Sequence, residues 1–171
     1  MKKDTLGITL VECMLCLLIA LLISGTAAPA LKALIENNQR AQSTNQMTSA
    51  IHFARSTAVL DRVTVTICAG IGACAGQSSW HDSLLTFSDI NANGRLDQGE
   101  TVLRIDALAQ GYSWRWAGFR QNGFLQFEPD GTTRAQNGTL TLCRELQPLN
   151  QIIISLSGRA RGQRPARHAS C

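Results

Sequence analysis

The side chains whose type and spacing most clearly suggest chemistry lie at the C-terminal end. Residues 158–171, called the tail below, contain no acidic residue and four arginines: Arg159, Arg161, Arg164 and Arg167. The chain has 16 Lys and Arg against 12 Asp and Glu, so the part before the tail is neutral and the net charge of +4 belongs to the tail. Guanidinium groups bind phosphates through paired hydrogen bonds. The tail therefore predicts non-specific binding to the DNA backbone.

The alternative for the tail is a solvated basic end that aids solubility or touches anionic lipid. Gly158, Gly162 and Pro165 disfavour a helix in this segment. We therefore expect a flexible strip outside the core, which the terminal Cys171 could tie to the rest of the protein. The concentration of the whole net charge in Arg, with no Lys, favours DNA over the alternative.

A second polar motif, DINANGRLDQGE at residues 89–100, fits the spacing of calcium-binding loops. The flanking residues read as strands rather than helices, and Arg95 occupies the seventh position of the motif. We therefore favour a polar turn rich in turn-forming residues and keep a calcium site as the alternative. Its ligands would be Asp89, Asn91, Asn93, Asp97 and Glu100.

The six cysteines divide into two groups. Cys13 and Cys16 lie in an apolar segment, where small soft side chains facing lipid or other helices are the simplest interpretation. The other four follow that segment, and we expect them to form two disulfides in an oxidising compartment. Three pairings are open; we favour a local Cys68–Cys74 loop and a Cys143–Cys171 link that holds the tail.

Other candidate motifs point away from catalysis. Tyr112, Trp114 and Trp116 lie on one face of a predicted strand; they could stack bases, but a core position is favoured. The glycines of residues 70–75 mimic a nucleotide-binding turn, but no helix follows them. The histidines are scattered and no nucleophile–base pair is evident, so we expect no enzyme and no cofactor: His52, His81 and His168.

The elements that position the tail, the 89–100 loop and the cysteines begin with an N-terminal helix. Ile8 to Ala28 is an apolar run whose one charge is Glu12. As a helix its 21 residues span about 31 Å, enough to cross a bilayer. Lys2 and Lys3 precede it and keep that end cytoplasmic. A carboxylate inside such a segment is costly, so we expect Glu12 to have a partner and a function.

The helical pattern resumes after Pro29 with a stripe that indicates an amphipathic helix. The simplest element is one long helix, softened near Gly25 and Pro29. The stripe consists of Met47, Ala50, Ile51, Ala54 and Ala58.

From Arg62 the pattern changes to alternating residues separated by Gly, Asn and Asp turns, which predicts about seven short antiparallel strands. Because no helices alternate with them, the fold class is α+β, with the long helix followed by antiparallel sheet. We expect these strands at residues 63–69, 83–89, 100–106, 111–118, 123–131, 139–143 and 151–158.

The first residues carry a family resemblance. A short basic leader ending in Gly7, an apolar helix and Glu12 at its fifth position resemble a type IV prepilin. The resemblance implies cleavage after Gly7 by the prepilin peptidase and N-methylation of Ile8. It also implies that Glu12 neutralises the N-terminal amine of a neighbouring pilin in the filament. Most of the family has Phe where this chain has Ile8.

The rest of the chain resembles the minor-pilin branch that contains FimT, FimU and the secretion pseudopilin GspH, through residues 87–104 and the order of elements. The tail sequence GRAR, residues 158–161, is similar to the GRxR motif of FimT-type pilins, which bind DNA during natural transformation. The resemblance implies DNA and other pilins as partners, an inner-membrane protein with a periplasmic head, and later a pilus subunit at the cell surface. The alternative is a purely structural minor pilin or pseudopilin that primes or caps the filament.

These expectations divide the chain into five segments. They are a leader, a membrane helix, an amphipathic helix, a β head and the tail, at residues 1–7, 8–30, 31–61, 62–157 and 158–171.

Overall fold

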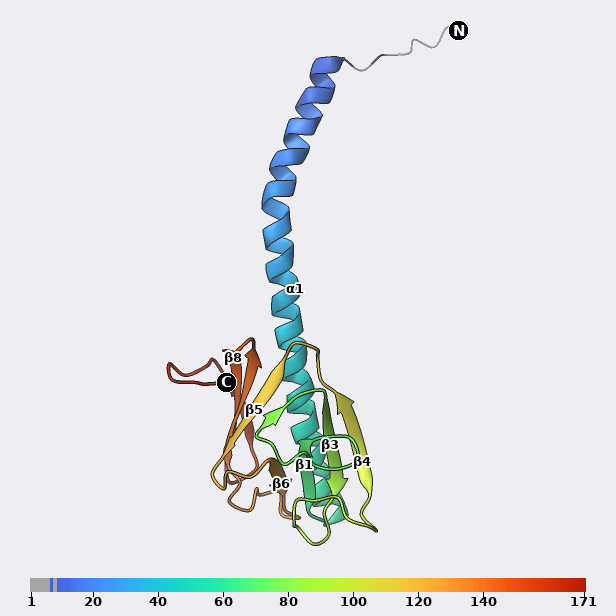
Figure 1. Ribbon diagram of the computed structural model, residues 1–171, viewed down its shortest axis with the longest axis vertical. Coiled ribbons are helices and arrows are strands. Elements are labelled where there is room, and N and C mark those ends of the chain that lie inside the picture. The colour runs from blue at the N-terminus through green and yellow to red at the C-terminus, as the bar shows by residue number, and fades with distance from the viewer. Residues whose placement is uncertain (1–6, 8) are drawn as a thin grey trace, which may run out of the picture. The chain divides into compact units, whose positions relative to one another are not determined.

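The computed structural model describes Gly7 and residues 9–171, with the side chain of Thr26 left out. Two compact units follow one another along the chain: the first ends at Gln39, and the second is Arg40–Cys171. A single helix, α1 (Leu10–Asp61), belongs to both units, and nine strands follow it (Figure 1).

The first turn of α1 is held by a side-chain cap. Thr9 precedes the helix, and its Oγ1 accepts a hydrogen bond of 3.3 Å from the backbone N–H of Glu12. The order Thr9–x–x–Glu12 is the spacing of a capping box, which satisfies N–H groups that a helix start leaves free. The start of α1 is therefore explained by local chemistry.

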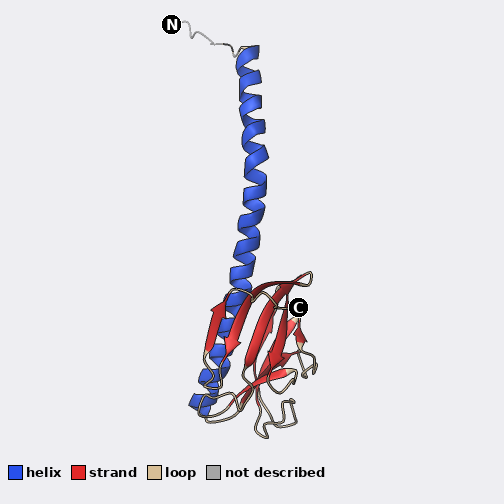
Figure 2. Cartoon of the chain, turned by 90° about the vertical axis from the view of Figure 1, so that its left-hand side faces the viewer, coloured by secondary structure: helices blue, strands red, loops and turns tan. Residues whose placement is uncertain are grey.

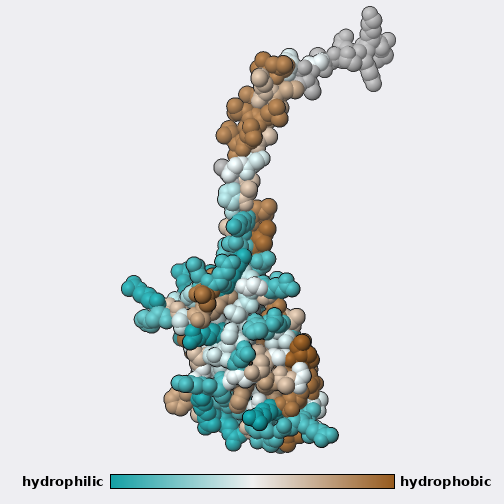
Figure 3. Space-filling view, viewed as in Figure 1, coloured by the Kyte–Doolittle hydropathy of each residue, from teal (hydrophilic) through white to brown (hydrophobic). Residues whose placement is uncertain are grey.

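The N-terminal part of α1 is long and apolar enough, by length and composition, to cross a membrane. Its apolar side chains are exposed, as the brown residues along this part of the helix in Figure 3 show. The helix runs without interruption past Gly25 and through Pro29, so the softening that we expected there does not break it.

The C-terminal part of α1 packs on the strands through the stripe that the sequence predicts. Its five apolar members have no exposed surface: Met47, Ala50, Ile51, Ala54 and Ala58. The first buried side chain on this helix is Ser43, whereas Leu31, Leu34 and Ile35 are exposed. Packing therefore begins at Ser43, well after residue 31, where the sequence predicts the start of the amphipathic helix.

The strands form two antiparallel sheets, which lie beside the C-terminal part of α1 (Figure 2). The first sheet has the order β4-β3-β1-β6 and the second the order β2-β5-β7-β8-β9. The strands of the first sheet are β1 (Val65–Ala69), β3 (Ser83–Ser88), β4 (Val102–Ala107) and β6 (Phe124–Phe127). Those of the second are β2 (Ser79–Trp80), β5 (Ser113–Gly118), β7 (Gly138–Arg144), β8 (Gln147–Ile154) and β9 (Ala160–Gln163).

All seven expected strands form, and the structure adds two more, β2 and β9. The second addition corrects one expectation about the tail. Ala160–Gln163 is not a flexible strip outside the fold, because it pairs antiparallel with β8 at the edge of the second sheet. Ala160 also packs against the core.

The main core lies where the stripe of α1 meets the inner faces of both sheets. It includes the aromatic residues of β5 and the turn before it, since Tyr112, Trp114 and Trp116 are each at least 92% buried. The rings of Trp80 and Trp116 lie 6.1 Å apart, within the range of favourable aromatic pairs. The expectation that these aromatic residues belong to the core is confirmed.

A second, smaller core covers the other face of the first sheet. Cys68, Leu85 and Phe87 are buried there, and partly buried Leu96 and Phe124 pack against them. Because Leu96 belongs to the 89–100 loop, this loop acts as a cover for the second core. Strand β1 is consequently buried along its whole length.

Candidate nucleic-acid interface

The tail begins at a turn that only glycine tolerates well. Gly158 is buried and has a φ of +73°. A Cβ at this position would lie 2.0 Å from the carbonyl oxygen of Gly131. Arg55 of α1 donates hydrogen bonds to Gly131 O at 3.0 Å and to Ser157 O at 3.1 Å. The glycine of the GRAR sequence is therefore part of a fixed turn held by the helix.

Strand β9 then carries the next part of the tail along the edge of the second sheet. Arg161 pairs with Ile153 of β8, and Gln163 pairs with Gln151. Residues paired in this way project from the same face of an antiparallel sheet. Ile152 and Ile154 are buried on the inner face, so Ile153 and Arg161 project from the outer face, away from α1.

After β9 the tail turns back across the outer face of the second sheet. The backbone N–H of Ala166 donates to Oε1 of Gln151 on β8 at 3.1 Å. Gln151 and its register partner Thr141 on β7 are both buried, although they belong to the outer row. The tail is thus the layer that covers this row.

The end of the tail is fastened at two further points. Cys171 forms a disulfide with Cys143 of β7. Arg115 of β5 donates from Nη1 to the carbonyl oxygen of Cys171 at 2.9 Å and to Oγ of Ser170 at 3.2 Å. Residues 164–170 therefore form a loop that is anchored at both ends.

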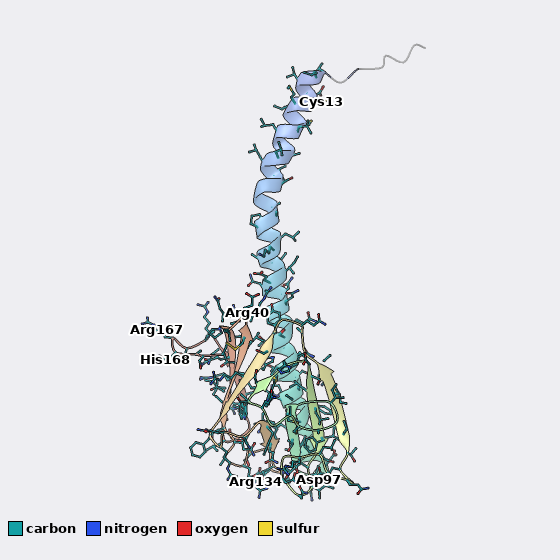
Figure 4. The ribbon with its side chains drawn as sticks, in the orientation of Figure 1. Cys13, Arg40, Asp97, Arg134, Arg167 and His168 are labelled. Carbon is teal, nitrogen blue, oxygen red and sulfur yellow. A yellow bond between two sulfur atoms is a disulfide. The ribbon has the colours of Figure 1, made fainter. Side chains whose placement is uncertain are left out.

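The four tail arginines are exposed: Arg159, Arg161, Arg164 and Arg167. Among Gly7 and residues 9–171, the three ion pairs involve His81, Arg104 and Arg134, and none includes a tail arginine. Figure 4 shows Arg167 and His168 on the loop that extends from the head, and Figure 3 shows hydrophilic residues over the same region. The structure thus holds the backbone of the tail while leaving its charges accessible.

Both disulfides of the second unit have the pairing that the sequence favours. Cys68–Cys74 closes a local loop with a Cα–Cα distance of 5.5 Å, and Cys143–Cys171 joins β7 to the tail at 5.8 Å. Cys13 and Cys16 are free and exposed on α1.

The carboxylates of the 89–100 loop are occupied by hydrogen bonds from the protein itself. Asp89 is fully buried. Its Oδ2 accepts from Thr66 Oγ1 at 2.6 Å, from Gln126 Nε2 at 2.7 Å and from the N–H of Gly94 at 2.8 Å. Its Oδ1 accepts from the N–H of Asn93 at 3.0 Å. Asp89 therefore joins the loop to β1 and β6.

The remaining acids of the loop have similar internal partners. Asp97 accepts hydrogen bonds from the side-chain amides of Asn91 and Asn93, and these bonds lower the pKa of its carboxyl group. Glu100 accepts from the N–H groups of Ile90 and Asp97. Within the part of the chain that is described, no cluster of three acids, histidines or cysteines could hold a metal ion.

The glycine of the calcium-like motif also has a structural explanation. Gly94 has a φ of +75°, and a Cβ there would lie 2.3 Å from the ring of Phe124. The close approach lets the loop cover the second core. Gly94 therefore has a packing role in this turn, whatever the loop binds.

The residues expected to act in processing and assembly lie at the start of the chain. Gly7 and Glu12 are exposed, and Ile8 lies outside the described residues. Their roles in cleavage, methylation and assembly stay predictions.

Comparison with known proteins gives one family. Residues 43–158 match the family described as type II transport protein GspH. The match begins at the first buried residue of α1 and ends directly before the four arginines of the tail. A comparison with curated proteins finds no match.

Among solved structures, the chain is similar to the type IV minor pilin FimU of Pseudomonas aeruginosa in two crystal forms. In one form the TM-score is 0.58 with 20% identity, covering 80% of this chain and 95% of FimU. In the other the TM-score is 0.56 with 19% identity, covering 72% and 91%. These values show a common fold, a long N-terminal helix packed on antiparallel sheets.

Proposed function

The chain belongs to the GspH family, and from this premise we propose that it is a minor pilin that binds DNA non-specifically through its tail. Membership and fold make it a minor-pilin-like or pseudopilin-like structural protein and not an enzyme. An N-terminal apolar helix in such a protein is consistent with anchoring in the inner membrane and assembly into a pilus. The proposed activity is capture of DNA for uptake in natural transformation, as in FimT-type pilins.

One observation carries the proposal: the tail is fixed by its backbone, while all four of its arginines are exposed and outside the ion pairs of the described residues. Each guanidinium can give paired hydrogen bonds to a phosphate. Because no acid lies in the tail, DNA binding would not have to break an existing charge pair there. A fixed tail also loses less conformational freedom on binding than a mobile one.

The same proposal gives the first residues their roles. The prepilin peptidase cleaves after Gly7, Ile8 is N-methylated, and Glu12 pairs with the N-terminal amine of another pilin in the filament. The head is periplasmic before assembly and reaches the cell surface in the pilus. The order of basic leader, glycine, apolar helix and Glu12 supports these steps.

A second candidate function is a structural minor pilin that primes or caps the filament. The likeness to FimU favours it. The two candidates differ in what they need from the tail, because a structural subunit has no use for four accessible arginines.

The test measures the affinity of the detergent-solubilised full chain for a duplex oligonucleotide over a range of salt concentrations. Non-specific binding predicts a dissociation constant of about 1 to 100 µM at physiological salt. If all four arginines contact phosphates, log K falls against log salt with a slope of about −3.6. Arg159→Gln with Arg161→Gln should weaken binding and flatten the slope by about two units.

A matched control removes the same charge elsewhere. Arg62 and Arg95 are exposed on other loops, so Arg62→Gln with Arg95→Gln should leave the slope nearly unchanged. Equal losses in both double variants would mean that only net charge matters. If replacement of all four tail arginines left the affinity for DNA unchanged, the structural minor pilin would be the remaining candidate function.

A further inference from the structure

A groove lies on the second sheet beside the end of the tail. Its lining includes Arg115 and Ala117 of β5, then Phe119 and Gln121 of the turn after β5, and Asn137 before β7. The backbone N–H of Phe119 donates to the carbonyl oxygen of Asn137 at 2.9 Å, which fixes the start of this turn.

Phe119 is the aromatic residue of this region that the core does not use. Tyr112, Trp114 and Trp116 are buried, whereas Phe119 keeps 75% of its surface exposed. Arg120, the next residue, is also exposed. An exposed ring beside a positive charge is the combination with which proteins bind single-stranded nucleic acid, because the ring stacks on a base and the charge attracts phosphate.

The register of the second sheet connects this groove to the tail. Ala117, Thr139, Ile153 and Arg161 are successive partners on β5, β7, β8 and β9, so they form one row across the outer face. Three strand spacings of about 4.8 Å separate Arg161 from Ala117 by about 14 Å. Thr139 and Ile153, between them, are only half-buried. At a rise of about 3.4 Å per nucleotide, this row matches about four stacked nucleotides.

We propose that this groove holds an unpaired base of single-stranded DNA stacked on Phe119, while a phosphate beside that base contacts Arg120 and phosphates further along the same strand contact the tail arginines. The proposal rests on DNA binding by the tail and specifies the form of the DNA. A duplex keeps its bases stacked inside, so only a single strand can use the ring. The interface therefore prefers single-stranded DNA over duplex of the same length.

The experiment uses the full chain in detergent and three labelled probes: a single-stranded oligothymidine, the same backbone without bases, and a duplex. The first two have equal charge and differ only in whether a base can stack. The wild-type protein should bind oligothymidine at least about fivefold more tightly than the abasic strand, the lower end for stacking one base. Phe119→Ala should remove this difference, and Phe119→Trp should retain it.

The matched control is Leu146→Ala. Leu146 is 83% exposed in the turn between β7 and β8, at the opposite end of these strands. This variant should keep the fivefold preference for oligothymidine over the abasic strand. That result would show that the preference depends on Phe119 and is not abolished by removing another exposed apolar side chain. Phe119→Ala should melt at the wild-type temperature, because the ring lies outside the core.

Two results would overturn the proposal. One is equal binding of oligothymidine and the abasic strand by the wild-type protein; the other is the same loss on both strands in Phe119→Ala. In either case, the proposal that the tail binds DNA would still stand if the double variant Arg159→Gln with Arg161→Gln bound all three probes more weakly than the wild type. Absence of binding to every probe would overturn both proposals.

Discussion

The tail and the 89–100 loop are the two polar segments of this protein that resemble ligand-binding motifs, and the fold treats them in opposite ways. In the tail, backbone groups and Cys171 make the contacts, and the arginines remain exposed. In the loop, the carboxylates themselves accept the hydrogen bonds that hold the turn. Asp89 even lies beneath the surface, against β1 and β6.

The difference shows why a binding motif in the sequence is not sufficient. Its side chains can bind a ligand only when they are not already hydrogen-bonded within the fold. The loop has the residues of a calcium site, but their oxygen atoms already have internal donors. The tail has residues common in solvated basic ends, yet its arginines are held on a fixed backbone. Each prediction below tests one side of this comparison.

The largest expected effect is in the loop. Asp89→Ala would leave the hydroxyl group of Thr66 and the amide of Gln126 without their buried acceptor. We expect the free energy of unfolding in urea to fall by more than about 3 kcal/mol, because each unsatisfied buried donor costs about 1 to 3 kcal/mol. Asp97→Asn, at an exposed position, is the control. A fall below about 1 kcal/mol in Asp89→Ala would contradict the structural role.

The next effect concerns the end of the tail. Cys143→Ser with Cys171→Ser opens a link between residues 28 positions apart. Loop entropy predicts a loss of about 3.6 kcal/mol in stability. DNA affinity should fall severalfold, because the arginines after β9 lose their fixed arrangement. The control, Cys68→Ser with Cys74→Ser, should lower stability without changing DNA affinity. If both double variants bind DNA like the wild type, anchoring of the tail has no role in binding.

A smaller effect is expected at the turn into the tail. Gly158→Ala places a side chain in the left-handed region and against Gly131 O. The conformation alone costs about 1 to 2 kcal/mol. We expect a lower melting temperature and weaker DNA binding, because Arg159 is displaced. Gly162→Ala is the matched control, since a Cβ there meets nothing within 4 Å. Equal melting temperatures for the two variants would contradict the fixed turn.

A smaller effect still concerns the pH dependence of the loop. Hydrogen bonds from Asn91 and Asn93 hold the pKa of Asp97 below its ordinary value of 3.8. Folding therefore favours the ionised form, and its contribution is present above pH 3.8 and is lost as the pH falls through the lower folded value. An NMR titration of the Asp97 carboxyl carbon should show this midpoint. A midpoint at or above the ordinary value would show that the two amides do not donate to Asp97.

The smallest expected effect is that of calcium, for which we expect none. Calorimetry with calcium at about 1 mM, the range of weak extracellular sites, should give no saturable heat and no change in melting temperature. Saturable binding that disappears in Glu100→Gln would restore the calcium alternative and remove the contrast between the two segments.

The sequence by itself determined the elements whose signals are local. The apolar run and the five-residue stripe predict α1, because a helix places residues three and four apart on one face. Alternating residues between turn-forming residues predict seven strands, and the bias of charge identifies the tail. The pairing of the cysteines was favoured but not decided, since three pairings satisfy the same spacing.

Only the tertiary structure decided which polar groups are available. The sequence ARGQ of β9 has little strand character; it becomes a strand because β8 offers it an edge with free hydrogen-bonding groups. Phe119 is exposed although three aromatic residues just before it are buried, because the strand ends at Gly118. The carboxylate of Asp89 is occupied because it accepts hydrogen bonds from Thr66 and Gln126, which lie 23 and 37 positions away in the sequence. Such contacts depend on how distant segments pack, and a local pattern of residues carries no record of them.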